Sequence, residues 1–139
     1  QLAIELNIDG EDWIADPGTY LYTPSPKDRD AYRSVHAHAT PRIRAGEPAR
    51  LDLGMFRLED NAHARCLSFG SDGFEGMHTG YGAPVHRRIE LQAGAIRISD
   101  MAPATELPDA KATIIKDAKT LRALWELDLP FSPGYGQQD

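Results

Sequence analysis

Apolar and polar residues alternate in short stretches along much of this chain, and the alternation predicts β-strands. The clearest case is LAIELNI followed by Asp9-Gly10 and EDWIAD, in which two alternating segments flank an Asp-Gly pair. Asp-Gly readily adopts the positive φ angles of a tight turn between antiparallel strands. The sequence therefore predicts a β-hairpin over residues 2–16.

The same alternation recurs further along the chain. VHRRIELQ and AIRISDM, joined by Ala93-Gly94, form a second predicted hairpin. The last candidate strand is LRALWELDL, for which a helical turn is the alternative prediction. Residues 17–34 are rich in proline and charge, which predicts a long loop of the kind that often carries function. Single strands are expected at 41–45, 49–59, 64–70, 111–117 and 121–129.

Eight or more short strands without long helical periodicity indicate an all-β chain, and the hairpins favour an antiparallel β-sandwich. The 139 residues fit a single domain over 1–139. A chain of this length can bury a sufficient core without a disulfide or a metal. Because it opens on Gln1 in what reads as mid-strand, we expect a domain cut from a longer protein and truncated at its N-terminal edge.

Composition narrows the functional classes. The formal net charge is −6 and the pI is about 5.3, which argues against a general nucleic-acid binder. No stretch approaches the roughly 18 apolar residues of a membrane span, and no targeting signal is visible. Cys66 has no partner for an intramolecular disulfide, and its alternating apolar surroundings predict a buried, inert thiol.

Two histidines and one aspartate form the first candidate site. His36 and His38 are two residues apart, so an extended backbone would direct both side chains to one face. Asp16 ends a predicted strand, and carboxylate and imidazole groups are ordinary zinc ligands. The alternative is a pair of surface histidines, with Asp16 capping the Pro17-Gly18 turn.

A second set of candidates surrounds the long loop. Tyrosine rings can pack on sugar faces, and guanidinium groups can hold carboxylates or sulfates in a bidentate manner. The alternatives are the rim of a hydrophobic core for the tyrosines and a solvated charged face for the arginines. The residues concerned are Tyr20, Tyr22, Tyr32, Arg29, Arg33, Arg42 and Arg44.

The stretch GMHTGYG places His78 and Tyr81 among glycines. A His-Tyr pair in such a loop could take part in catalysis. The alternative is a structural tyrosine in a turn where glycine provides the required backbone freedom. The sequence contains neither a nucleophile elbow nor a phosphate-binding loop.

Three ordered stretches carry a resemblance to a known family: QLAIELNIDGEDWIADPGTY, RDAYRSVHAHAT and FEGMHTGYGAPVHRRIELQAGAIRISD. Together they resemble the C-terminal β-sandwich domain of the heparinase II/III-like polysaccharide lyases, a group that includes alginate and oligoalginate lyases. The likeness covers residues 1–101. It implies an N-terminal α/α toroid domain in the same parent chain, packed against the sandwich with the active site between them.

The resemblance also implies a structural zinc ion. In the family, an H-x-H-A-D segment precedes the first strand and provides one zinc ligand and a catalytic histidine. The matching positions for the other protein ligands are Asp16 and His38, whereas the role of His36 is left open. The upstream segment would lie before Gln1, so zinc is expected to bind the isolated chain weakly.

The implied activity is β-elimination on an acidic polysaccharide that contains uronic acid, either a heparin- or heparan-like glycosaminoglycan or alginate. The resemblance also implies a periplasmic or secreted location. The resemblance implies that most of the catalytic groups lie outside this chain, which alone is expected to be inactive. The chain would contribute one wall of the substrate cleft, formed by Tyr20, Arg29, Tyr32, Arg33, His78 and Tyr81.

The sequence departs from the family at two positions. Ala39 stands where asparagine is common, and Thr79 stands where an acidic residue is common. Both departures are compatible with a changed substrate preference or with loss of activity. The alternative function is therefore a non-catalytic carbohydrate-binding or structural β-sandwich module.

Overall fold

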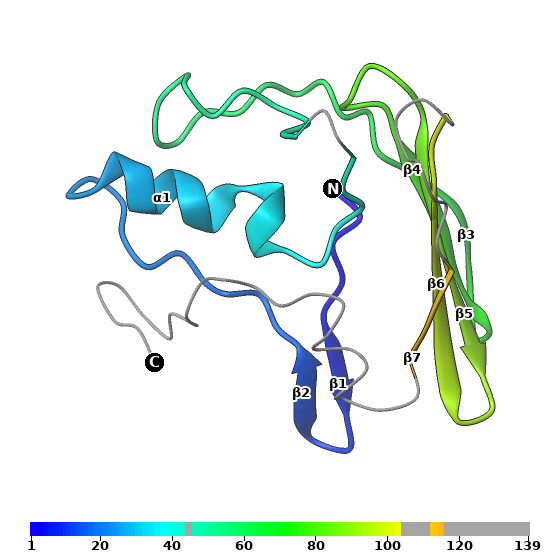
Figure 1. Cartoon of the computed structure of the whole chain (residues 1–139). Coiled ribbons are helices and arrows are strands. Elements are labelled where there is room, and N and C mark those ends of the chain that lie inside the picture. The colour runs from blue at the N-terminus through cyan, green and yellow to red at the C-terminus, as the bar shows by residue number, and fades with distance from the viewer. Residues whose placement is uncertain (44–45, 104–111, 116–139) are drawn as a thin grey trace.

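The computed structural model describes residues 1–43, 46–103 and 112–115. Within these residues the chain is built mainly from antiparallel strands, with one short α-helix and one turn of 3-10 helix (Figure 1). In chain order the elements are β1 (Leu6–Ile8), β2 (Glu11–Ile14), α1 (Pro26–Arg33), η1 (Val35–Ala37), β3 (Arg65–Gly70), β4 (Gly73–His78), β5 (Val85–Gln92), β6 (Ala95–Met101) and β7 (Ala112–Ile115).

The strands form two sheets. β1 and β2 make a two-stranded hairpin, and β3 to β7 make a five-stranded meander in which every neighbouring pair is antiparallel. The hairpin and α1 lie on the same side of the larger sheet (Figure 1). The fold is therefore the all-β, sandwich-like arrangement that the sequence predicts, and both predicted hairpins are confirmed.

A compact apolar cluster joins the hairpin to the large sheet. Ile14 from β2, Ala39 from the segment after η1 and Ile98 from β6 are each less than a tenth exposed and pack together. Partly buried apolar residues surround them: Ile4, Leu6, Trp13, Ile89 and Ile96. Because Ala39 directly follows His38, this core fixes the backbone beside one of the candidate ligands.

The predicted loop over residues 17–34 is wrong in its second half, where α1 forms. Ser25 caps the helix by accepting a hydrogen bond from the Asp28 amide (3.3 Å), and Pro26 occupies the first turn. Proline suits that position because its missing N–H would have had no helical partner. The proline that favours a loop in the sequence pattern therefore starts a helix.

The extended backbone that would direct His36 and His38 to one face is not formed, because residues 35–37 form η1. Residues 41–43 and 49–59 contain no strand, and the latter segment consists of turns and irregular backbone. Conversely, β4 arises in the glycine-containing stretch that was expected to be a loop. The predicted strand at 121–129 lies outside the described residues.

The prediction that Cys66 is buried is also wrong. Its side chain is exposed rather than buried. The reason is that β3 is the outer strand of the described sheet, pairing there with β4 alone, so that all six of its residues are exposed. Alternation along β3 predicts the strand correctly but does not reveal that no described element covers its apolar side chains.

Gly73 provides a test of the β3–β4 turn. Its φ angle is +153°, and a Cβ atom there would lie 2.0 Å from the Ile89 carbonyl oxygen. Gly73→Ala should therefore lower the free energy of unfolding by at least about 3 kcal/mol. Gly94→Ala is the matched control: its φ angle is +70° but the space is open, so about 1–2 kcal/mol is expected from the backbone alone. Chemical denaturation measures both, and equal losses would contradict the steric account.

Candidate functional site

Asp16 lies two residues beyond the end of β2, at the point where the chain leaves the small sheet. Its Oδ1 atom accepts a hydrogen bond from the Gly18 amide (2.8 Å). This contact is the turn-capping role that sequence analysis gave as the alternative to metal binding. The second carboxylate oxygen, Oδ2, is not used by the turn and faces His38.

His38 follows η1 at its C-terminal end. Its amide donates to the Val35 carbonyl (3.4 Å), and its Nδ1 atom lies 3.0 Å from Asp16 Oδ2. The His38 side chain is 24% exposed and the Asp16 side chain is 49% exposed, so the pair is open to a ligand on one side. The structure thus brings together two side chains that are 22 residues apart and that the family resemblance paired.

The backbone that carries His38 is held from two sides by charged groups. The Glu47 carboxylate hydrogen-bonds to the Ser34 hydroxyl and accepts from the Val35 amide (3.1 Å), which anchors the start of η1. At the other end, Arg42 Nη2 donates to the carbonyls of His36 (3.0 Å) and His38 (3.3 Å). These contacts fix the direction in which the His38 side chain leaves the backbone.

Arg87 holds the same segment from the large sheet. Its Nη1 atom donates to the carbonyls of Ala39 (2.5 Å) and Leu2 (2.8 Å), while Nε and Nη2 bind the Asp100 carboxylate at 2.7 Å each. Sequence analysis missed this residue. A signal was present, however: Val85, Arg87 and Ile89 alternate along β5, so the arginine lies among apolar residues on one face of a strand.

Two cavities adjoin the Asp16–His38 pair. The larger, of about 280 Å³, is lined by Asp16 and His38 together with Arg33, Thr40 and Glu47. The smaller, of about 110 Å³, contains the same pair and the backbone around Ile4. The pair therefore faces space that a ligand or an additional protein group can enter.

The donor set of the described residues is incomplete for zinc. Among residues 1–43, 46–103 and 112–115, no group of three or more His, Cys, Asp or Glu side chains could hold a metal ion. His36 is exposed and does not join Asp16 and His38. Structural zinc requires four donors, so at least one further protein ligand would have to come from outside this set.

The aromatic candidates of the loop and of α1 are packed against each other. The rings of Tyr20 and Tyr32 lie 5.5 Å apart between centroids, and Tyr32 is only 2% exposed. Tyr20 adopts a φ angle of +59°, a conformation that is strained for a tyrosine. The Arg29 guanidinium lies 5.4 Å from the centroid of the more exposed Tyr22 ring, which places a cation and an aromatic surface together.

Arg33 acts as a clamp on the following loop. Its Nε atom donates to Asp30 (2.8 Å), Nη1 donates to Gly54 (2.9 Å), and Nη2 binds the Leu51 carbonyl. The guanidinium borders the 280 Å³ cavity, but these contacts occupy all three of its nitrogens. The arrangement favours a role in shaping the cavity wall over direct binding of a carboxylate.

His78 and Tyr81 lie side by side, with ring centroids 5.5 Å apart, and both are engaged by the backbone. His78 is 1% exposed, and its Nδ1 atom accepts from the Gly80 amide (3.2 Å). The Tyr81 hydroxyl donates to the Pro41 carbonyl (3.3 Å). Burial, followed by the negative charge of Glu47, raises the pKa of Tyr81 to about 12, so the phenol is neutral at physiological pH.

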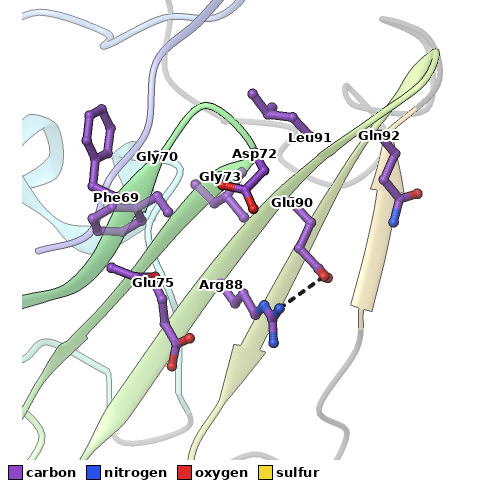
Figure 2. A pocket seen from close by; sticks show the side chains of 12 residues that line it. Phe69, Gly70, Asp72, Gly73, Glu75, Arg88, Glu90, Leu91 and Gln92 are labelled. Atoms are coloured by element: carbon purple, nitrogen blue, oxygen red, sulfur yellow. Dashed lines mark ion pairs between the residues drawn. The ribbon is translucent and has the colours of Figure 1, made fainter.

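A separate cavity of about 420 Å³ lies on the large sheet beside the β3–β4 turn and β5 (Figure 2). The Phe69 side chain at its rim is 84% exposed, and Arg88 and Glu90 form an ion pair of 3.3 Å within it. None of the candidate residues from sequence analysis lines this cavity. The arginine that lines it, Arg88, is already paired with Glu90, so this cavity is not the site favoured here.

Comparison with protein families shows which family the chain belongs to. The heparinase II/III-like, C-terminal family matches residues 1–114, so this chain belongs to that family and the predicted resemblance is confirmed. Membership suggests that the chain is one part of a polysaccharide lyase. The parent protein would act on a polysaccharide and contain another domain. Searches of curated proteins and of solved structures returned no match. Within the described residues, no helix is long and apolar enough to cross a membrane.

The buried histidine predicts a pH dependence of stability. Burial, reinforced by nearby positive charge that includes Arg87, lowers the pKa of His78 from 6.5 to about 4. The unfolded chain therefore takes up this proton at a higher pH than the folded chain does. The stabilising effect of the neutral side chain is complete above pH 6.5 and is lost as the pH falls toward 4.

His78→Asn tests this dependence, because asparagine can still accept from the Gly80 amide but does not titrate. Denaturation at pH 7 and at pH 4 should show that the wild type loses up to about 3 kcal/mol more than the variant. Identical losses in the two proteins would show that His78 does not carry the effect.

Proposed function

We propose that this chain is the β-sandwich part of a polysaccharide lyase that cleaves a uronic-acid-containing polysaccharide by β-elimination. In this proposal, Asp16 and His38 are two protein ligands of a structural zinc ion, and the surface beside them forms one wall of the substrate cleft. The observation that carries the proposal is the 3.0 Å approach of Asp16 Oδ2 to His38 Nδ1 in a chain that belongs to the lyase family.

The geometry of the pair fits zinc. Two donors of a tetrahedral zinc ion, each about 2.0–2.1 Å from the metal, lie roughly 3.3 Å from each other. The observed 3.0 Å separation needs only a small adjustment to reach this value. One side of the pair borders the cavities described above, which leaves room for the missing donors.

When bound, the zinc ion would join the end of β2 to the segment after η1 as a cross-link. The roles of this chain's residues are to present and orient the donors. The Gly18 amide orients the Asp16 carboxylate, and Glu47 and Arg42 hold the backbone on both sides of His38. The metal would thus stabilise an arrangement that hydrogen bonds have already formed.

β-Elimination removes the proton α to a uronate carboxylate and protonates the leaving oxygen, so it needs a base, an acid and donors for the developing anion. We assign these groups to the other domain of the parent protein. This chain would provide substrate contacts instead. Arg29 and Tyr22 offer a cation and a ring on the same surface, and Tyr20 is two residues before Tyr22 in the chain. The net charge of −6 repels an acidic polymer, but at physiological ionic strength salt screens this repulsion beyond about 8 Å, so arginines close to the polymer can outweigh it.

The alternative is a non-catalytic carbohydrate-binding or structural module, and one observation favours it. All six proposed cleft residues make internal contacts. Tyr32 and His78 are buried, Tyr81 binds a backbone carbonyl and Arg33 clamps a loop. The Tyr20 ring packs against Tyr32, and the Arg29 guanidinium lies over the Tyr22 ring. Such residues shape a surface without needing to touch a sugar. The two functions differ in whether the full-length protein turns over substrate.

The test uses the full-length protein, its zinc content and a panel of heparin-, heparan- and alginate-type polysaccharides. Product is followed by the ultraviolet absorbance of the unsaturated uronate. We expect about one zinc ion per chain and a growing absorbance on at least one substrate. His38→Ala and Asp16→Asn should each reduce zinc affinity at least about tenfold, because the first removes a donor and the second replaces a charged carboxylate donor with a neutral amide.

His36→Ala is the matched control, since it removes a neighbouring imidazole that does not join the pair. It should leave zinc content and activity unchanged. Zinc binding that survives His38→Ala would contradict the ligand assignment. Absence of product on every substrate, in a protein that still binds sugar or zinc, would favour the non-catalytic module.

A further inference from the structure

Arg87 combines full burial with contacts to three separate parts of the chain. It lies near the middle of β5 with a relative exposure of 0%. Its neighbours across the sheet are Gly76 of β4 and Asp100 of β6. The side chain of Leu2 reaches into the space beside Gly76, where a Cβ atom would lie 2.8 Å from Leu2 Cδ2. The arginine is thus enclosed beneath the N-terminal segment.

The direction of the guanidinium group is fixed by Asp100. Nε and Nη2 donate to the two carboxylate oxygens, both at 2.7 Å, in a bidentate fork. Because the guanidinium is planar and rigid, this fork also sets where Nη1 points. Nη1 reaches the Ala39 carbonyl at 2.5 Å and the Leu2 carbonyl at 2.8 Å. Asp100 therefore aims Arg87 at the backbone of the segment after η1.

The Ala39 carbonyl is close to the candidate ligand along the chain. Ala39 follows His38 directly, is 3% exposed and packs in the apolar cluster between the sheets. Its carbonyl oxygen also accepts from the Ile4 amide (3.2 Å), so two donors hold it in place. In the preceding peptide group, the His38 carbonyl accepts from Arg42 and from the Thr40 amide.

We infer that Arg87 is a positioning residue for His38: through the Ala39 carbonyl it holds the backbone so that the imidazole faces Asp16 before any metal binds. This inference rests on the zinc site of the proposed function. Groups that orient a metal ligand without touching the metal typically change metal affinity 10- to 100-fold when they are lost. Lysine cannot replace Arg87, because an ammonium group lacks the planar fork that serves the carboxylate and the carbonyl together.

Arg87→Lys in the full-length protein tests the inference with two measurements. Competition with a chromophoric chelator should show that zinc affinity falls about 10- to 100-fold. In the metal-free protein, amide hydrogen exchange over residues 34–42 should become at least about tenfold faster, because the segment loses its anchor on the sheet. The second measurement does not depend on zinc or on activity.

Two control variants separate positioning from general stability. Val85→Ala removes buried methyl groups from the same strand without removing a contact to Ala39, so it lowers the melting temperature but leaves the carbonyl held. Arg88→Lys changes an exposed arginine whose partner is Glu90. Both controls should retain zinc affinity and the exchange rate of residues 34–42 within about threefold of wild type. If Arg87→Lys does not fold, Asp100→Asn takes its place, because it breaks the fork while keeping the arginine.

The outcomes are distinguishable. Zinc affinity and exchange within threefold of wild type in Arg87→Lys would overturn the inference, as would losses no larger than those of Val85→Ala. If the wild-type protein binds no zinc, the proposed site is wrong and the role of Arg87 toward a metal ligand falls with it. In that case the exchange measurement still shows whether Arg87 holds residues 34–42.

Discussion

A guanidinium group enclosed between the large sheet and the segments around Leu2 and Ala39 needs an acceptor for each of its nitrogens, and this requirement organises the centre of the molecule. Arg87 satisfies it with the carboxylate of Asp100 and with two carbonyls from segments far away in the sequence, those of Leu2 and Ala39. Removing one partner of a buried ion pair typically costs 3–5 kcal/mol, because the other charge is left without compensation. The large sheet, the N-terminal segment around Leu2 and the segment after η1 are consequently joined at one point.

The candidate site depends on this joint. The apolar cluster around Ile14, Ala39 and Ile98 brings the end of β2 close to the segment after η1, and Arg87 fixes the backbone there. Asp16 then extends from one side and His38 from the other until they are 3.0 Å apart. Membership of the heparinase II/III-like C-terminal family provides the chemical context for such a pair, and the geometry gives it a physical basis.

The sequence predicts the sheet much better than the loops. Two-residue alternation and a turn dipeptide identify both hairpins correctly, because these signals are local. Helix α1 was missed because proline occurs both at helix starts and in loops. The pattern of prolines does not show that Ser25 caps a helix here. Pairing Asp16 with His38 needed the family resemblance, since spacing along the chain does not reveal a contact across 22 residues. The buried positions of Tyr32 and His78 depend on tertiary packing, so the pattern could not separate cleft residues from core residues.

The most direct test of the account is a crystal structure of the full-length protein, with anomalous diffraction recorded at the zinc edge. The account predicts a zinc peak about 2.0–2.2 Å from both His38 and Asp16, with Arg87 still bound to the Ala39 carbonyl. A zinc ion held elsewhere, or no zinc while Asp16 and His38 contact each other directly, would contradict it.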